Sequence, residues 1–358
     1  MPRVNSLSVS GYKSIRELKD FKLNALNVLI GANGAGKSNF IGFFRLIGQI
    51  LGEQLQRSVG LGGGPDALLH FGRKTTDKLT ATIDFGNFPY SFELIPTSDN
   101  KMMFDHELVW AKRSEVGEVS TSSSGYFETQ AHKYHETGQF HGLDIDQLLR
   151  VYHFHDTSDT AKVKRIQAVN DNLRLKPDAA NLAPYLRFLN ETHAAEYRRI
   201  VETIRLVMPF FGDFVHRPGN PEHVELEWTQ KGKPDTPFKA HMLSDGSLRF
   251  ICLATLLLQP VALLPDTILI DEPELGLHPY AIAVLVDIFK QVAEDKQLIV
   301  STQSVELVNG LSPEDIIVVD QEDGASTFRR YTEDELSGWL AEYSMGEIWK
   351  RNILGGRP

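Results

Sequence analysis

The chain has 358 residues, of which 42% are hydrophobic and 23% are charged, a composition that excludes collagen-like and fully disordered chains. Its single cysteine, Cys252, excludes an internal disulfide and a thiolate metal cluster within one chain. The net charge of −10, from 37 basic and 47 acidic residues, argues against a uniformly basic nucleic-acid binder but allows a local basic patch.

Two features of exported or membrane proteins are missing from the sequence. No apolar run approaches the length of about 18 residues that a membrane span requires. The first residues contain no hydrophobic region of the secretory kind. We therefore expect a cytoplasmic protein without a membrane partner, built as one large domain or two modest ones.

The first predicted elements are two strands and a helix. Apolar residues alternate from Val4 to Val9, and the run 25–30 is apolar on both faces, which predicts a fully buried strand. After Gly36 the apolar residues follow a helical stripe as far as Leu51. The stretch 61–65 contains three consecutive glycines and is expected to be a loop.

The middle of the chain changes its pattern twice. Alternating segments at 79–85 and 90–95 predict antiparallel strands. The polar stretch 120–125 is expected to be an exposed connection. Leucine and tyrosine residues spaced by three and four predict a helical insert over 178–210.

From residue 243 onward, helices alternate with strands. The predicted elements are a helix at 247–258, a strand at 267–271, a helix at 279–292 and a strand at 297–301. This alternation predicts right-handed crossovers and a parallel sheet. The sequence therefore predicts an α/β fold with a central parallel sheet, an antiparallel β subdomain and an inserted helical subdomain. The expected parts are an N-terminal half (1–156), a helical insert (157–222) and a C-terminal half (223–358).

A phosphate-binding loop is predicted directly after the buried strand. Eight residues match the pattern G-x-x-x-x-G-K-[ST], and a helix follows them. Glycines let backbone N–H groups turn inward, and the helix N-terminus adds its positive end. The alternative, a glycine-rich turn with a chance Lys-Ser pair, fits this strand–loop–helix setting poorly. The residues expected to hold ATP here are Gly31, Ala32, Asn33, Gly34, Ala35, Gly36, Lys37, Ser38 and Asn39.

Two carboxylates end the predicted strand 267–271. Unpaired carboxylates at the end of an apolar strand are costly, so they need a cation or a chemical task. We expect Asp271 to share Mg²⁺ with Ser38, and Glu272 to orient and polarise the attacking water. The alternative is a solvated acidic turn, which the nearby phosphate loop makes less attractive.

A third segment precedes the strongly apolar helix that begins near residue 247. Ser244 and Gly246 could offer a hydroxyl and backbone N–H groups to a phosphate. In isolation, the simpler interpretation of Ser244 is a helix N-cap in a turn.

The order of these three motifs resembles that of the ATP-binding cassette (ABC) superfamily. It is most similar to the RecF-like and OLD-like branch, often labelled AAA-family ATPases, which shares its ATPase head with the SMC proteins. The resemblance covers both halves of the chain and leaves the middle divergent. The segments that carry it are 31–38, 243–247 and 271–279, with further similarity at 12–15 and 352–358.

The resemblance implies an ABC-type ATPase head that forms a head-to-head homodimer on ATP. ATP and Mg²⁺ held by Lys37 and Ser38 of one subunit would meet Ser244 and Gly246 of the other, with Lys13 as a further nucleotide ligand. Hydrolysis would open the dimer. Such a switch would serve DNA maintenance, or prokaryotic defence through a separate effector protein. The alternatives are a nucleotide-dependent scaffold without significant turnover and a transporter ATPase subunit.

Two residues depart from the family's pattern. Asp245 replaces a glycine of the common Leu-Ser-Gly-Gly signature and brings a negative charge near a phosphate. Gln303 occupies the place of the switch histidine, and glutamine can hydrogen-bond a γ-phosphate or a water but cannot carry a proton charge. We therefore expect slow hydrolysis, with Gln303 acting beside Glu272 and Lys37. The family's mid-chain glutamine has no clear counterpart.

His153 and His155 share one face of a predicted strand. Three interpretations are open: a catalytic metal site with Asp156, a polar lining between sheet and insert, or an approach of His155 to the nucleotide. The apolar residues at helical spacing between 339 and 353 are expected to pack on the chain's own core, with a docking surface as the alternative.

One local basic stretch could contact the phosphates of DNA or RNA. Between 161 and 176, five basic residues stand against one acidic residue, a net charge of +4. The stretch lacks interleaved aromatic residues for base stacking, and a solvated helix face explains it equally well. Its basic residues are Lys162, Lys164, Arg165, Arg174 and Lys176.

Overall fold

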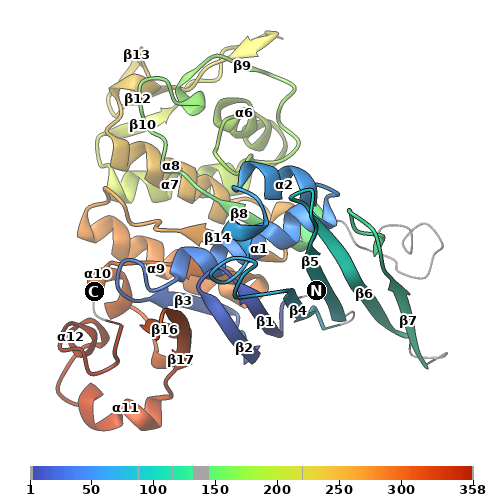
Figure 1. Ribbon diagram of the computed structural model, residues 1–358. Coiled ribbons are helices and arrows are strands. Elements are labelled where there is room, and N and C mark those ends of the chain that lie inside the picture. Colours follow the sequence, from blue (N-terminus) through green and yellow to red (C-terminus); the bar gives the residue numbers. More distant parts are fainter. Residues whose placement is uncertain (1–2, 87–88, 114–116, 132–144, 220, 357–358) are drawn as a thin grey trace.

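The computed structural model describes residues 3–86, 89–113, 117–131, 145–219 and 221–356 (Figure 1). Its centre is a six-stranded sheet in which five strands run parallel and the edge strand β17 runs antiparallel. In spatial order the strands are β17 (Ala325–Arg330), β16 (Ile316–Glu322), β3 (Leu26–Ile30), β15 (Gln297–Ser301), β14 (Thr267–Asp271) and β8 (Leu149–Tyr152). The predicted α/β fold with a central parallel sheet is confirmed.

Side chains of this sheet alternate between two hydrophobic cores. Leu269 and Ile299 belong to the core around helix α1 (Lys37–Leu51), whereas Ile268, Ile270 and Val300 belong to the core around the helices on the opposite face. Successive side chains of a strand point to opposite faces, so burial of both faces makes the sequence continuously apolar. This explains why β3, β14 and β15 could be predicted from apolar runs.

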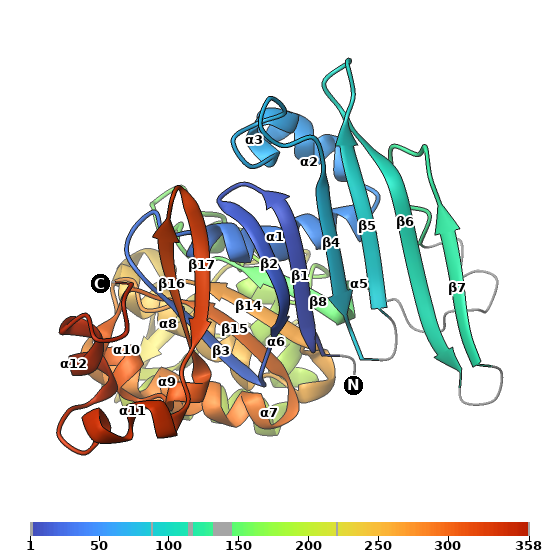
Figure 2. The same ribbon diagram turned by 60° about the horizontal axis from the view of Figure 1, so that its bottom comes forward.

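A second, antiparallel sheet packs over the α1 side. Its strands, in spatial order, are β2 (Ile15–Lys22), β1 (Ser6–Tyr12), β4 (Leu79–Asp84), β5 (Pro89–Pro96), β6 (Met102–Arg113) and β7 (Gly117–Ser123) (Figure 2). The stretch 120–125 was expected to be a connection, but residues 120–123 belong to β7 and pair with β6. Backbone hydrogen bonds to a neighbouring strand need no apolar side chains, so a serine-rich edge strand gives no alternating signal.

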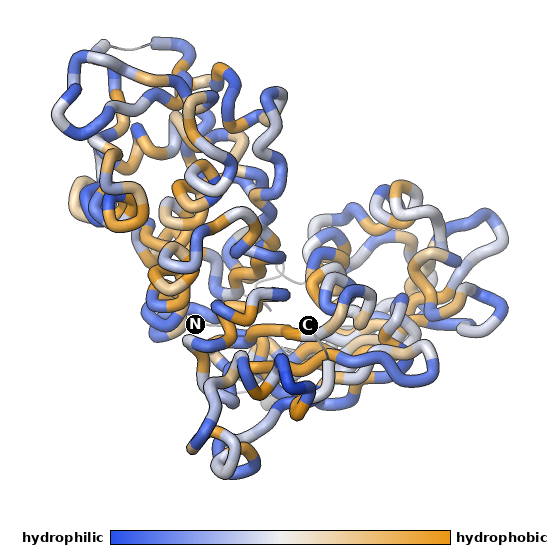
Figure 3. Tube along the Cα trace, turned by 90° about the vertical axis from the view of Figure 1, so that its left-hand side faces the viewer, coloured by the Kyte–Doolittle hydropathy of each residue, from blue (hydrophilic) through white to orange (hydrophobic). Residues whose placement is uncertain are grey.

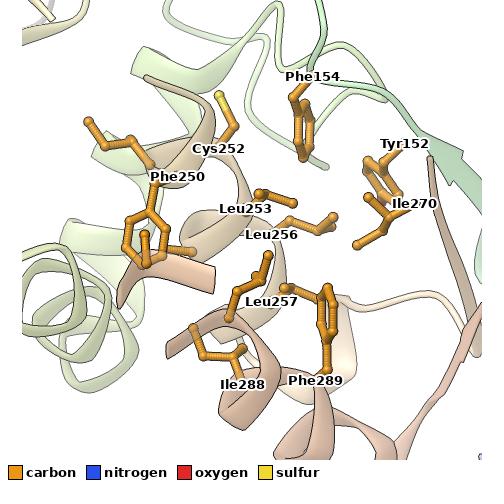
Figure 4. Packing of buried hydrophobic residues seen from close by; sticks show 14 of the residues in the cluster. Tyr152, Phe154, Phe250, Cys252, Leu253, Leu256, Leu257, Ile270, Ile288 and Phe289 are labelled. Carbon is orange, nitrogen blue, oxygen red and sulfur yellow. The ribbon is translucent and has the colours of Figure 1, made fainter. Parts of the chain in front are cut away.

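Helices cover the other face of the central sheet. They are α6 (Leu182–Thr192), α7 (Ala194–Val207), α8 (Asp245–Leu258) and α9 (Pro279–Asp295). Leu256 of α8 points toward Tyr152 and Ile270, and Leu257 lies near Ile288 and Phe289 of α9 (Figure 4). The helical insert predicted over 178–210 is present as two helices, which meet at His193.

Shorter elements complete the described chain. They are α2 (Leu55–Leu61), α3 (Pro65–Leu68), α5 (Ile145–Leu148), β9 (Gln167–Ala168), β10 (Phe211–Phe214), β11 (His223–Val224), β12 (Glu227–Gln230), β13 (Lys233–Lys239), α10 (Val305–Asn309), α11 (Glu333–Leu340) and α12 (Met345–Lys350). Apolar stretches gather where elements pack together, and many outer loops are hydrophilic (Figure 3). None of the helices in the described residues has the length and hydropathy needed to cross a bilayer.

The C-terminal segment returns to the start of the phosphate loop. Ile348 and Trp349 are fully buried, so packing on the chain's own core is confirmed for them, whereas Trp339 is 45% exposed. The Gly356 N–H donates to Asp320 Oδ2 at 3.0 Å. A Cβ atom on Gly356 would lie 3.3 Å from Gly31 Cα. Residues 357–358, the last two of the segment 352–358 that resembles the family, lie outside the described residues.

Candidate nucleotide-binding site

The predicted phosphate loop connects β3 to α1 in the expected strand–loop–helix order. Gly34 and Gly36 have positive φ values of 84° and 116°, which favour glycine. A Cβ atom at Gly36 would lie 2.0 Å from Ser326 Oγ, so no other residue fits there without displacing its neighbours. No atom of the described residues lies within 4 Å of the Cβ position of Gly34, and Ser38 is exposed, so among the described residues this side of the loop is open to a ligand.

Hydroxyl groups from distant parts of the chain hold the loop from behind. The Ser326 hydroxyl, on β17, donates to the Ala35 carbonyl at 2.6 Å and lies 2.7 Å from Ser14 Oγ. Asn39 Nδ2 donates to the same Ser14 oxygen at 2.7 Å. Asn39 was predicted as a nucleotide ligand, and in this structure its amide helps to fix the loop. The roles of Ser14 and Ser326 were missed because their neighbours lie far away in sequence.

Lys37 is buried within the loop that it was predicted to serve. Its Nζ donates to the carbonyl oxygens of Gly31 at 2.6 Å and Ala32 at 3.1 Å. Burial lowers the pKa of Lys37, and the carboxylates of Glu272, Asp271 and Glu274 act against that change. Among the described residues, the hydrogen-bond partners of this buried ammonium group are carbonyl oxygens, although acids lie nearby, and such a group suits a site for a phosphate chain.

The two carboxylates at the end of β14 adjoin the end of β15. The buried Ser301 hydroxyl donates to Asp271. Glu272 has a φ of 44°, a left-handed conformation that costs a glutamate about 1 kcal/mol or more, and its N–H donates to the Ser301 carbonyl at 2.9 Å. Gln303 Nε2 donates to Glu272 Oε1. The structure thus brings Glu272 and Gln303 together as a pair.

Ser244 lies at the start of α8 on an exposed surface. Its hydroxyl accepts from the Ser247 N–H at 3.2 Å, as expected for an N-cap. Gly246 packs so closely on the loop after β14 that a Cβ atom would lie 2.1 Å from the Gly276 carbonyl oxygen. In the part of the chain that the structure describes, no hydrogen bond joins 244–247 to the phosphate loop. Asp245 is also exposed.

Arg249, which the sequence did not single out, fixes the surroundings of this segment. Its guanidinium donates to the carbonyl oxygens of Leu275 at 2.8 Å, His155 at 2.9 Å and Phe154 at 3.2 Å. One side chain therefore links α8, the loop after β14 and the segment after β8. A lone arginine in an apolar helix gives no sequence signal for contacts so far apart.

The two histidines after β8 have different environments. His155 Nε2 lies 2.9 Å from the Asp271 carbonyl oxygen, whereas His153 Nε2 is hydrogen-bonded to Arg45. Burial, followed by the positive charge of Arg45, lowers the pKa of His153 to about 4, so its imidazole is neutral at pH 7. Within the described residues, no three His, Cys, Asp or Glu side chains are grouped to bind a metal ion. The contact with Asp271 places His155 beside the end of β14.

Lys13 and the basic stretch are the remaining predicted ligands. Lys13 Nζ lies 5.5 Å from the Tyr12 ring centroid, and burial followed by repulsion from Arg45 lowers the pKa of Lys13. In the basic stretch, Lys162 pairs with Asp178, Lys176 pairs with Asp171, and Lys164 is buried. Part of the predicted positive charge is therefore neutralised or withdrawn from the surface.

The fold and this loop define the class of the protein, a P-loop nucleotide-binding domain whose fold matches that of solved SMC heads. The chain belongs to the family described as "AAA domain, putative AbiEii toxin, Type IV TA system", whose model matches residues 26–309. A search of curated proteins finds no match.

Solved SMC heads share the fold. An SMC head bound to the C-terminal winged-helix domain of ScpA aligns with a TM-score of 0.61 and 17% identity, over 93% of this chain and 99% of that one. A second SMC head, with an extended coiled coil and bound to the ScpA C-terminal domain, from Pyrococcus furiosus, aligns with a TM-score of 0.58 and 18% identity, over 96% and 99%. At these identities the likeness concerns the fold alone.

Proposed function

We propose that this chain is an ATP-binding and ATP-hydrolysing switch whose active site forms between two copies. One observation carries the proposal. Ser244 is exposed at the start of α8, and among the described residues no hydrogen bond joins it to the phosphate loop of the same chain. A serine and N–H groups at a helix start can bind a phosphate that a second subunit presents. ATP would then act as a clamp between two heads, and hydrolysis would release them.

The described residues fit a magnesium-bound triphosphate. The open N–H side of 31–38 would hold the phosphates, with Lys37 moving from its carbonyl partners to the β- and γ-phosphates. Ser38 and Asp271 would hold Mg²⁺, which supplies positive charge to the phosphate oxygens. Lys13 would add a further cation beside the loop.

Glu272 and Gln303 would act on the attacking water. The Glu272 carboxylate would accept a hydrogen bond from that water and orient it toward the γ-phosphorus. The amide of Gln303 already contacts this carboxylate. Because an amide cannot take up a proton as a histidine can, we expect slow turnover, which suits a switch.

The biological setting of the switch is prokaryotic defence or DNA maintenance, with a separate effector protein in the cytoplasm. The name of the family supports defence, since it refers to a toxin of a toxin–antitoxin system. The two SMC heads were solved with a domain of another protein, which supports a protein partner. DNA binding through the basic stretch has less support, because Lys162 and Lys176 are already paired with carboxylates.

Glu272→Gln tests the switch. The variant should bind ATP but lose about 100-fold or more of its turnover, since an amide cannot act as the base. Dimers should therefore accumulate with ATP and Mg²⁺ in sedimentation velocity. Glu294→Gln, on the exposed face of α9, is the matched control and should behave as wild type. Turnover of Glu272→Gln equal to that of wild type would remove Glu272 from this role, and wild type without turnover would favour the scaffold alternative.

A further inference from the structure

Glu274 is a third carboxylate behind the predicted catalytic pair, and no role in hydrolysis has been given to it above. Only 8% of the residue is exposed. Its Oε1 accepts two hydrogen bonds, from the Thr302 hydroxyl at 2.6 Å and from the Gln303 N–H at 2.9 Å. Its Oε2 is buried and accepts no hydrogen bond from any residue that the structure describes.

This environment is energetically unfavourable for a carboxylate. A buried polar atom without a partner costs about 1–3 kcal/mol, and more when the group is charged. Burial raises the pKa of Glu274, although both hydrogen bonds oppose that change. An apolar residue would fill the same space at lower cost, so a hydrogen-bond acceptor at this buried position needs an explanation beyond packing.

The contacts of Glu274 lead directly to the hydrolytic pair. Its side chain holds the backbone of Gln303, and the side chain of Gln303 in turn donates to Glu272. Thr302, its other donor, is fully buried, and its N–H donates to the Leu29 carbonyl of β3 at 3.0 Å. Glu274 is therefore braced against the central sheet while it fixes the residue next to the site.

We propose that Glu274 is a positioning residue for ATP hydrolysis, which holds the Gln303 backbone so that the Gln303 amide keeps Glu272 directed at the attacking water. The inference rests on the proposed function and adds a residue that touches neither nucleotide nor water. It requires a hydrogen-bond acceptor at Oε1 of residue 274 and does not require a negative charge. The side-chain hydrogen bonds of Glu274 reach Thr302 and Gln303 and leave the phosphate loop in place, so nucleotide binding should change little.

Two substitutions at residue 274 distinguish a requirement for a hydrogen-bond acceptor from a requirement for a negative charge. Glu274→Gln keeps the size of the side chain and an oxygen that can accept from Thr302 and Gln303, so kcat should stay within about threefold of wild type. Glu274→Ala removes the acceptor, and kcat should fall at least about tenfold, because an unpositioned base loses much of its effect. In both variants, ATP affinity measured by fluorescent-nucleotide titration should stay within about twofold.

A double-mutant cycle with Gln303→Ala tests whether Glu274 influences kcat through the Gln303 side chain. If Glu274 acts through the Gln303 side chain, adding Glu274→Ala to Gln303→Ala should lower kcat by less than about twofold further. Thr302→Val, which removes one of the two donors and keeps the Gln303 N–H, should lower kcat less than Glu274→Ala does. Circular dichroism melts show which variants are folded at the assay temperature, and Glu274→Gln and Thr302→Val keep the test available if Glu274→Ala unfolds.

Four results would overturn the assignment. They are a folded Glu274→Ala variant with wild-type kcat, equal losses in the Gln and Ala variants, a parallel loss of ATP affinity, or additive losses in the double mutant. Any of these, seen while wild type hydrolyses ATP and Glu272→Gln does not, leaves the proposed function intact. Absence of hydrolysis by wild type would instead overturn both.

Discussion

Three energetically unfavourable features occur together around the phosphate loop and the end of β14. Glu272 takes a left-handed φ, Glu274 buries an oxygen that has no hydrogen-bond partner among the described residues, and Lys37 is a buried cation. Each is unfavourable for folding by itself. Glu272 and Glu274 follow the end of β14, and Lys37 begins α1 after the loop that follows β3. Such concentration is typical of sites where a fold gives up stability for chemistry.

The neutral state of His153 makes stability depend on pH. An unfolded chain binds a proton to this imidazole near pH 6.5, whereas the folded chain does so only near pH 4. The contribution of His153 is therefore fully present above pH 6.5 and is lost as the pH falls toward 4. His153→Gln, which keeps an acceptor for Arg45, should lose less melting temperature between pH 7.5 and pH 5 than wild type. Equal losses in thermal melts would show that His153 is not buried in its neutral form.

Among the secondary-structure elements of the site, the start of α8 and the loop after β14 are in close backbone contact. Arg249 holds the Leu275 carbonyl, and Gly246 lies directly against the Gly276 carbonyl. The segment that we expect to meet the second subunit is therefore fixed to the loop that follows Glu272. Because the two backbones are in direct contact, a displacement of the start of α8 must also displace the loop after β14, and the reverse.

Gly246→Ala tests this contact. The new methyl group would lie 2.1 Å from the Gly276 oxygen, so the loop must move. We expect ATP affinity within about twofold of wild type and at least about tenfold lower turnover, as the composite site loses its alignment. Gly338→Ala is the matched control, because its Cβ position in α11 is open and alanine favours a helix. Equal turnover in the two variants would contradict the role of the contact.

How far the elements could be predicted depends on where their partners lie. Strands β14 and β15 were predicted to the residue, because burial on both faces leaves a continuous apolar run. The edge strand β7 was missed, since its serine-rich sequence carries no alternation. In the site, Lys37 and Ser38 follow from a local motif, whereas Arg249 and Ser326 act through carbonyl oxygens more than 20 residues away in sequence. No spacing rule reveals such contacts.

In the whole molecule, the central sheet positions the predicted nucleotide-binding and catalytic residues of the chain. The central strands separate two cores. The phosphate loop follows β3, Asp271 is the last residue of β14, and Gln303 follows β15, so all three lie at the carboxyl ends of neighbouring strands. Parallel strands place those ends at one edge, which is why a nucleotide site forms there. Ser244 approaches from the helical face and remains exposed, so the site of a single chain is incomplete in our account.

Mixing two inactive variants tests the shared site most directly. Lys37→Ala lacks a working phosphate loop, and Ser244→Arg lacks a working partner surface, so each alone should hydrolyse almost no ATP. In an equal mixture, half of the random pairs are mixed, and each mixed pair has one complete site. The mixture should therefore recover up to about a quarter of wild-type ATPase activity. A mixture as inactive as its components, or a Ser244→Arg variant that hydrolyses ATP at the wild-type rate, would contradict a site formed between two chains.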